Sequence, residues 1–188
     1  MTTFKKFSRV PNDYYATPFS ATEALLKAVR FSGSIWEPAC GEGHISRVLQ
    51  RHGHRVISTD LIERGFGTSG IDFLKTSGTP KFRNIVTNPP YSDKLIPAFW
   101  QHALSFTRRT GGTVAMLVND VALHHERSFP ELMKNPPTDI FALDRIMCLP
   151  NGKEPQFKYA KQFYYWIVHE QNPAHAGTRF HWLPTKRV

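Results

Sequence analysis

The most informative segment of the sequence for the fold is Arg83-Asn84-Ile85-Val86-Thr87-Asn88-Pro89-Pro90-Tyr91. Its β-branched run Ile85-Val86-Thr87 predicts a short buried strand. The strand must end at Asn88, because neither of the following prolines can donate a hydrogen bond to a sheet. Each proline also keeps the residue before it extended, which fixes Asn88 and the Pro89 carbonyl in place. These groups should therefore stand at the carboxyl edge of an open α/β sheet, where such sheets bind ligands.

The tetrapeptide Asn88-Pro89-Pro90-Tyr91 has the chemistry of a clamp for an amino group. The Asn88 amide oxygen and the Pro89 carbonyl can each accept a hydrogen bond from a planar NH2 group. Tyr91 adds an aromatic face on which a flat ring can stack. Asn-Pro pairs also occur in ordinary surface turns, so the tetrapeptide alone leaves a simple turn as an alternative.

The composition favours a single domain that meets a polyanion. The 188 residues are enough for one domain with a sizeable core. A formal net charge of +9 and a pI of about 9.8 favour nucleic acid over a membrane as the partner. The sequence has no apolar run of 18 residues, and its first six residues lack the apolar core of a signal peptide. Two cysteines are too few for a disulfide framework, which favours a cytoplasmic location.

The rest of the chain alternates strands and helices. Strands are predicted at residues 34–37, 55–60, 113–118, 144–149 and 162–169, with a brief further element at 71–74. Helices are predicted at residues 24–29, 44–52, 95–109 and 122–133, the last broken near Pro130. Thr17 or Ser20 can cap the first helix, and Ser92-Asp93 the third. This order predicts an α/β fold: a Rossmann-like, mostly parallel seven-stranded sheet with helices on both faces and an antiparallel strand near one edge.

The turn after the first predicted strand contains two glycines, Gly41 and Gly43, which let backbone amides approach a ligand closely. It does not suit a phosphate. The Lys-Ser/Thr of a P-loop is missing, and so is the third glycine of a dinucleotide fingerprint. Glu37, at the end of that strand, would repel a pyrophosphate and attract a cation instead.

Two more carboxylates follow at strand ends. Asp60 suits a ribose diol, and Asp72 beside Phe73 suits the amine and the ring of an adenine. Each carboxylate alone is more often a helix cap or a solvated loop residue. Their order along the chain, together with Glu37, favours a cofactor that carries a cation, a ribose and an adenine, and S-adenosylmethionine is such a molecule.

These residues carry a resemblance to a known family. The chain resembles class I S-adenosylmethionine-dependent methyltransferases that modify amino groups, and is most similar to small adenine N6 methyltransferases of phages and prophages. The matching segments are Tyr15-Ala16-Thr17-Pro18, residues 37–43, Thr59-Asp60-Leu61, Arg64-Gly65-Phe66-Gly67, residues 71–74 and Asn88-Pro89-Pro90-Tyr91. They occur in family order, and beyond residue 91 only the strand pattern matches.

The resemblance implies a role for each matched residue. The cofactor would be held by Tyr15, Thr17, Pro18, Glu37, Pro38, Ala39, Gly41, Gly43, Asp60, Leu61, Asp72, Phe73 and Asn88. Among these, Thr17 and Pro18 would lie against the methionine end of the cofactor, and Glu37 would face its ammonium group. The catalytic residues would be Asn88, Pro89, Pro90 and Tyr91. No metal site is expected, because the adjacent His124 and His125 would face different ways on a helix.

We therefore expect an S-adenosylmethionine-dependent methyltransferase that acts on adenine N6 in DNA. Residues 1–188 would form one catalytic domain, since nothing after residue 91 is long enough for a separate target-recognition domain. Site specificity should then be short or relaxed, with phosphates held by Lys5-Lys6, Arg108-Arg109, the 153–161 loop and Lys186-Arg187. An RNA base and a protein glutamine stay open as substrates, and a catalytically inactive cofactor-binding subunit stays open as another class. The sequence predicts neither an oligomeric state nor a target site.

Overall fold

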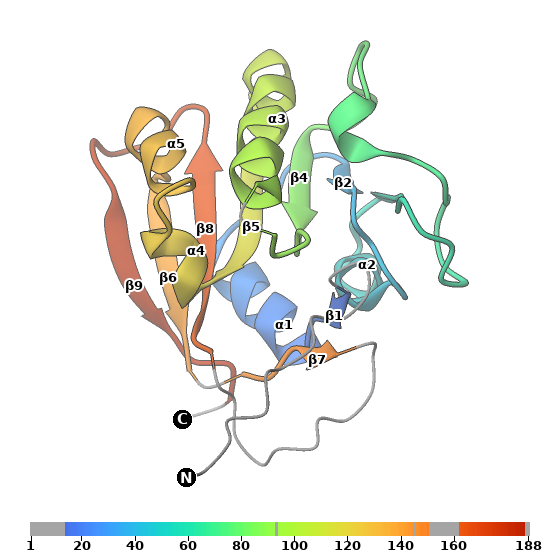
Figure 1. Ribbon diagram of the computed structural model, residues 1–188, viewed down its shortest axis with the longest axis horizontal. Helices are drawn as coiled ribbons and strands as arrows, with labels where there is room; N and C mark the ends of the chain where they lie inside the picture. Colours follow the sequence, from blue (N-terminus) through green and yellow to red (C-terminus); the bar gives the residue numbers. More distant parts are fainter. Residues whose placement is uncertain (1–13, 93, 145, 151–161, 187–188) are drawn as a thin grey trace, which may run out of the picture.

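The computed structural model describes residues 14–92, 94–144, 146–150 and 162–186, and its centre is a seven-stranded sheet (Figure 1). The strands are β2 (Ile35–Glu37), β3 (Val56–Ser58), β4 (Asn84–Thr87), β5 (Thr113–Asn119), β6 (Asp139–Leu143), β8 (Tyr164–Glu170) and β9 (Arg179–Leu183). Their order across the sheet is β3-β2-β4-β5-β8-β6-β9. Only β8 runs antiparallel to its neighbours in this sheet of described strands. The predicted fold class is confirmed.

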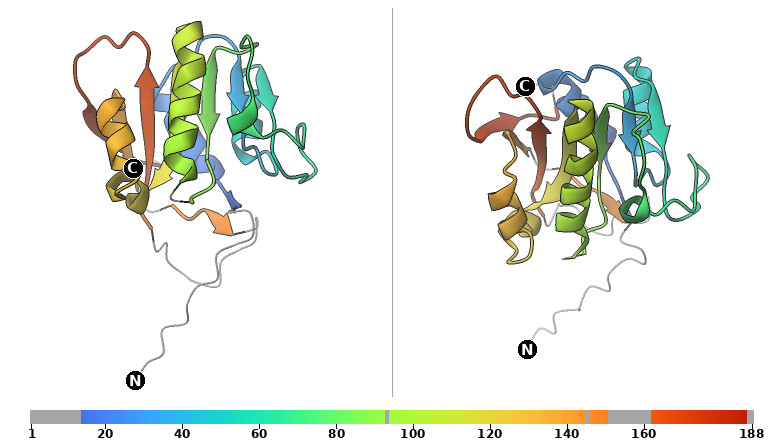
Figure 2. Two further views of the ribbon diagram at one scale, coloured as in Figure 1. Left: turned by 45° about the horizontal axis from the view of Figure 1, so that its top comes forward. Right: turned by 90° about the horizontal axis from the view of Figure 1, so that it is seen from above.

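Helices cover both faces of the sheet (Figures 1 and 2). Helices α1 (Phe19–Ala28) and α2 (His44–Arg51) pack on one face, and α3 (Leu95–Thr110), α4 (Asp120–His124) and α5 (Phe129–Lys134) lie on the other. Strand β5 shows why both faces can be covered. Its Ala115 and Leu117 join the core under α1 and α2, whereas Val114 and Met116 join the core under α3. This alternation is the side-chain period of a strand that is buried on both sides.

A second, two-stranded sheet ties the start of the described chain to its later part. Strand β1 (Tyr15–Ala16) pairs antiparallel with β7 (Leu149–Pro150). Both segments lie near the carboxyl end of β4 (Figure 1). The pairing therefore brings residues 15–17 beside the end of the central strand, 70 residues away in sequence.

The C-terminal half departs from the prediction. The strand predicted at 144–149 is wrong: β6 ends at Leu143, and only Leu149 of the predicted range joins a strand, β7. Ile146 and Cys148 are buried because they pack in the hydrophobic core, although they do not pair with any described strand. Their alternating apolar pattern therefore resembled that of a strand. Strand β9 was missed within the polar tail, because its Phe180 and Trp182 are 53% and 83% exposed and its pairing depends on β6. An edge strand of this kind has little sequence signal of its own.

Several smaller expectations are also wrong. Residues 71–74 lead into a short 3-10 helix, Phe73–Lys75, and form no strand. Helix α1 begins after Pro18 without a side-chain cap, so neither Thr17 nor Ser20 caps it. By contrast, the break predicted near Pro130 within residues 122–133 is confirmed, because α4 ends at His124 and Pro130 lies in the first turn of α5, as prolines often do. Asp93, half of the predicted cap of α3, lies outside the described residues, and none of the described side chains caps that helix.

Within the described part of the chain, no helix is both long and apolar enough to cross a membrane.

Candidate active site

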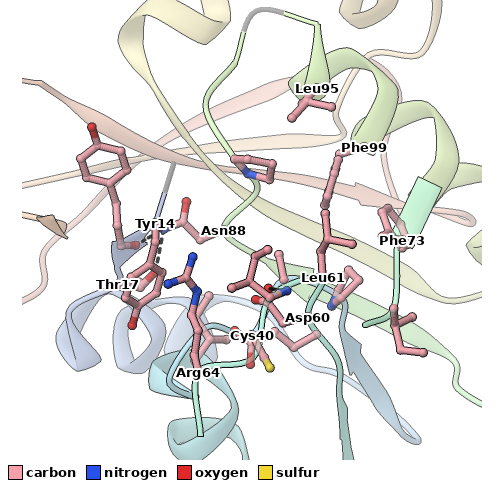
Figure 3. Close-up of a pocket in the computed structure, with 18 of the residues that line it drawn as sticks. Tyr14, Thr17, Cys40, Asp60, Leu61, Arg64, Phe73, Asn88, Leu95 and Phe99 are labelled. Atoms are coloured by element: carbon pink, nitrogen blue, oxygen red, sulfur yellow. Dashed lines mark hydrogen bonds between the residues drawn. The ribbon is translucent and has the colours of Figure 1, made fainter. Parts of the chain in front are cut away.

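A cavity of about 320 Å³ lies at the carboxyl edge of β2, β3 and β4 (Figure 3). One wall comes from the segment around β1, another from the loops after β2 and β3, and a third from the first two turns of α3. The predicted site residues that line the cavity are Tyr15, Thr17, Glu37, Pro38, Ala39, Asp60, Leu61, Asp72, Phe73, Asn88 and Pro90. Residues far apart in sequence thus meet where an open α/β sheet binds ligands.

Asn88 has a fixed side-chain orientation. Its Nδ2 donates to the Tyr15 backbone carbonyl at 2.9 Å and to the Thr17 Oγ1 at 3.0 Å (Figure 3). A carbonyl oxygen can only accept, so the NH2 side of the carboxamide must face Tyr15. The Asn88 Oδ1 is buried and has no hydrogen-bond partner among the described residues. One strong acceptor is therefore left over in the wall of the cavity.

Glu37 is a buried acid at the end of β2. Its side chain is 1% exposed, and its Oε2 accepts a short hydrogen bond from the Ser46 hydroxyl. The Ser46 hydroxyl also lies 2.6 Å from that of Ser58. Burial raises the pKa of Glu37 to about 8, against the lowering effect of the Ser46 hydrogen bond. The carboxyl is thus mostly neutral at pH 7 and would ionise beside a cation.

Asp60 joins two loops of the cavity wall. Its Oδ2 accepts from the Gly41 backbone N–H at 2.8 Å, and its Oδ1 accepts from the Ile62 N–H at 2.8 Å. Each carboxylate oxygen can accept a further hydrogen bond. Asp60 can therefore stabilise the loops and still contact a ligand that enters the cavity.

Asp72 and Phe73 make contacts within the protein that the sequence did not predict. Asp72 caps the short helix that follows it, through the Leu74 N–H at 3.1 Å, and pairs with Lys75 at 3.2 Å. Phe73 is 2% exposed, and the centre of its ring lies 4.8 Å from the centre of the Phe99 ring. Both line the cavity, but Phe73 offers only a small part of its surface there.

Gly41 and Gly43 lie against aromatic rings of the protein, and their predicted role beside the cofactor stays a prediction. Both have positive φ angles, 54° and 82°. A Cβ on Gly41 would lie 2.3 Å from the Tyr14 ring, and one on Gly43 would lie 2.5 Å from the Phe66 ring. The absence of side chains therefore admits two aromatic rings of the protein itself. Neither glycine lines the cavity.

Tyr91 also lies outside the cavity lining. Its ring meets the rings of Tyr15 and Tyr164 edge to face at 6.1 and 6.2 Å, and its hydroxyl donates to the Leu117 carbonyl at 3.4 Å. Burial raises the pKa of this hydroxyl well above its usual value. In this arrangement Tyr91 supports the β1 segment behind Asn88, and its predicted stacking on a target base stays a prediction. Pro18 and Pro89 are likewise absent from the lining.

Sequence reasoning missed Tyr14, Leu95 and Phe99, and gave Arg64 no role, although all four line the cavity. The Arg64 guanidinium lies 4.3 Å from the centre of the Tyr14 ring, which covers Gly41. Burial raises the pKa of Tyr14 to about 12, so its hydroxyl stays protonated. Arg64 belongs to a matched segment, which was a usable signal. The spacing of Leu95 and Phe99 predicted that they lie on the buried side of α3. It could not predict that the first two turns of this helix line a cavity.

Of the basic segments that were predicted to hold phosphates, the structure describes Arg108-Arg109 and Lys186. Helix α3 has 16 residues, and Arg108 lies about 20 Å along its axis from Leu95, which lines the cavity. Arg108 and Arg109 are in the last turn of this helix, and Arg109 donates to the Gly78 carbonyl at 2.6 Å. At this distance from Leu95 we do not expect the two arginines to contact the phosphates next to a base in the cavity. Lys5-Lys6, the 153–161 loop and Arg187 lie outside the described residues, and Lys186 is exposed.

No protein-family model and no curated protein matches the sequence. Solved structures do match the fold. A protein from Listeria monocytogenes assigned as a class I S-adenosylmethionine-dependent methyltransferase aligns with a TM-score of 0.57 at 15% identity, over 88% of this chain and 65% of its own. The chain has the fold of class I S-adenosylmethionine-dependent methyltransferases.

Two further solved structures that match this fold carry different names. A protein from Vibrio vulnificus assigned as the modification subunit of a type I restriction enzyme aligns with a TM-score of 0.59 at 13% identity, over 90% of this chain. A protein from Pyrococcus horikoshii assigned as an RNA methyltransferase aligns with a TM-score of 0.57 at 14% identity, over 88% of this chain. The aligned region spans 47% of the Vibrio protein and 91% of the Pyrococcus protein.

Proposed function

We propose that the protein is an S-adenosylmethionine-dependent N-methyltransferase that methylates adenine N6 in DNA. The observation that carries the proposal is the buried, unpaired Oδ1 of Asn88 in the wall of the cavity. A buried acceptor without a partner is costly, and a ligand that donates a hydrogen bond would remove that cost. An amino group is such a donor.

The cavity fits the proposed cofactor. Its volume of about 320 Å³ is at the small end of the range of ligand sites. Glu37 would receive the ammonium group, Asp60 the ribose hydroxyls and Asp72 the adenine amine. Leu61 and Phe99 supply apolar surface for the ring. When bound, the cofactor's sulfonium supplies an electrophilic methyl group.

Asn88 would prepare the acceptor nitrogen for the reaction. The lone pair of an aromatic amine is delocalised into its ring, which makes the nitrogen a weak nucleophile. Hydrogen bonds from the amine to the Asn88 Oδ1 and the Pro89 carbonyl would draw the nitrogen toward tetrahedral geometry and free its lone pair. Positioning of this kind can supply up to ~7–11 kcal/mol. The methylated amine is strongly acidic and loses its proton readily, so no tuned general base is required.

DNA is favoured as the substrate on charge and on the fold comparison. The net charge of +9 suits a polyanion, and the Vibrio protein is assigned as the modification subunit of a type I restriction enzyme. The target base would have to leave its stack to reach Asn88, which costs a few kcal/mol. The second candidate is the same chemistry on an RNA base, because the Pyrococcus protein, of nearly the same extent, is assigned as an RNA methyltransferase.

The test is to incubate the purified protein with methyl-labelled cofactor and, separately, DNA, RNA and a glutamine peptide. The products are digested and analysed by mass spectrometry. We expect N6-methyladenine in DNA. Label in RNA alone would move the substrate and keep the chemistry, and label in the peptide alone would exclude nucleic acid. Tight cofactor binding without transfer to any acceptor would identify an inactive subunit.

A further inference from the structure

We propose that Thr17 is a positioning residue that fixes the Asn88 carboxamide so that its oxygen, and not its nitrogen, faces the acceptor amine. The inference rests on the proposed function, because it assigns to Asn88 the role of binding that amine. It differs from the role that the sequence suggested for Thr17, which was contact with the cofactor.

Both hydrogens of the Asn88 side-chain NH2 group are donated in hydrogen bonds. The two Nδ2 hydrogens have two acceptors, the Tyr15 carbonyl at 2.9 Å and the Thr17 Oγ1 at 3.0 Å. If the carboxamide flipped, its oxygen would face the Tyr15 carbonyl and repel it. Thr17 is 3% exposed, so water cannot easily replace its hydroxyl. The orientation therefore depends on two neighbours, and only Thr17 contributes a side chain.

Both ends of this hydrogen bond are held rigidly by their own backbone. Thr17 precedes Pro18, and Asn88 precedes Pro89, and a residue before proline is restricted to an extended conformation. The β1–β7 pairing anchors Tyr15 and Ala16 just before Thr17. The β1 segment thus supports the end of β4 through its hydrogen bonds to Asn88. Loss of the Thr17 hydroxyl would release one Nδ2 hydrogen without moving the backbone.

Thr22 provides a matched control. It is a buried threonine, 0% exposed, in the neighbouring helix α1, and its Oγ1 has no hydrogen-bond partner among the described residues. Thr17→Val and Thr22→Val make the same chemical change at the same burial. Only the first removes an acceptor from Asn88. Thr17→Ser keeps the hydroxyl and serves as the conservative rescue.

The first measurement needs no activity. In protein labelled with 15N-asparagine, the hydrogen-exchange rates of the Asn88 carboxamide are followed by NMR, with the Asn88 signals assigned by their loss in Asn88→Ala. We expect one of the two hydrogens to exchange about tenfold faster in Thr17→Val, and neither to change in Thr22→Val or Thr17→Ser. Unchanged exchange in Thr17→Val would overturn the proposal, whether or not the protein transfers methyl groups.

The second measurement separates positioning from cofactor contact. Thr17→Val should lower kcat about tenfold and leave the cofactor Kd, measured by calorimetry, within about twofold of wild type. A Kd that rises tenfold with kcat unchanged would overturn the proposal and make Thr17 a cofactor contact. A wild-type protein that methylates no acceptor would refute the proposed function, and the proposal that depends on it, even if the exchange result held.

Discussion

Glu37 and Asn88 are opposite cases of a buried polar group at the residue scale. Asn88 is oriented by its neighbours and keeps one acceptor open, whereas Glu37 is neutral at pH 7 because burial disfavours its charge. A neutral acid must lose its proton before it can pair with an ammonium group. Cofactor binding should therefore be linked to proton release at this residue.

This linkage predicts that cofactor affinity depends on pH. The pKa of Glu37 is about 8 in the free protein, and a bound cation would lower it, so affinity should rise as pH increases from 6 to about 8 and then level off. Calorimetry at pH 7 in two buffers of different ionisation enthalpy should show net proton release. Glu37→Gln should bind more weakly and lose both the release and the pH dependence. Equal proton release by wild type and Glu37→Gln would assign it to another group.

A second prediction concerns the stability of a Gly41 variant. An alanine there would adopt an unfavourable positive φ and place its Cβ 2.3 Å from the Tyr14 ring. Gly65 is a matched control, because its φ of 74° is also positive but no atom lies within 4 Å of the added Cβ. Gly41→Ala should lower the free energy of unfolding by at least ~1 kcal/mol more than Gly65→Ala in urea denaturation. Equal losses would mean that Tyr14 moves away at no cost.

At the scale of elements, Asp139 holds the edge strand β9 on β6. It is 3% exposed and accepts from Arg179 at 2.9 Å and lies 2.8 Å from the His181 Nε2. Burial alone would raise its pKa, but the hydrogen bonds from His181 and Arg179 outweigh burial and lower it. Because the folded pKa lies below the unfolded one, the stabilisation is present above pH ~4 and is lost as pH falls below it.

Asp139→Asn should therefore lower the free energy of unfolding at pH 7 by ~1–3 kcal/mol, and the difference from wild type should shrink toward pH 3. Asp144→Asn is the control, since Asp144 is exposed and accepts one bond, from the Thr185 N–H. Its effect should be smaller. A pH-independent difference for Asp139→Asn would argue against an ionised carboxylate at that position.

Some strands could be predicted from the sequence and others could not. Strands β4 and β5 have apolar, β-branched cores and are buried on both faces, so their composition alone predicted them. Strand β9 gains its place from Asp139 on another strand, which no local pattern encodes. The site behaved similarly. The positions of Glu37 and Asp60 at strand ends were predictable from topology, but the hydrogen bond between Asn88 and Thr17 depends on the β1–β7 pairing between distant segments.

At the scale of the whole molecule, the cavity and the paired arginines lie at opposite ends of α3. This separation predicts that Arg108 and Arg109 do not help to hold a short DNA duplex at the site. Methyl transfer to a 12-base-pair duplex by the double variant Arg108→Ala, Arg109→Ala should keep the salt dependence of wild type. If both residues contacted phosphates, the log–log slope would fall in magnitude by ~1.8, and that result would require DNA to reach the far edge of the sheet.

The central claim is that the buried, unpaired Oδ1 of Asn88 binds the amine that receives the methyl group. The most direct test is a single-turnover measurement of N6-methyladenine formed in an oligonucleotide by folded wild-type and Asn88→Ala protein, with cofactor Kd measured in parallel. We predict that Asn88→Ala binds the cofactor within about threefold of wild type and transfers the methyl group at least about a hundredfold more slowly. A folded Asn88→Ala protein that methylates adenine at nearly the wild-type rate would contradict the claim.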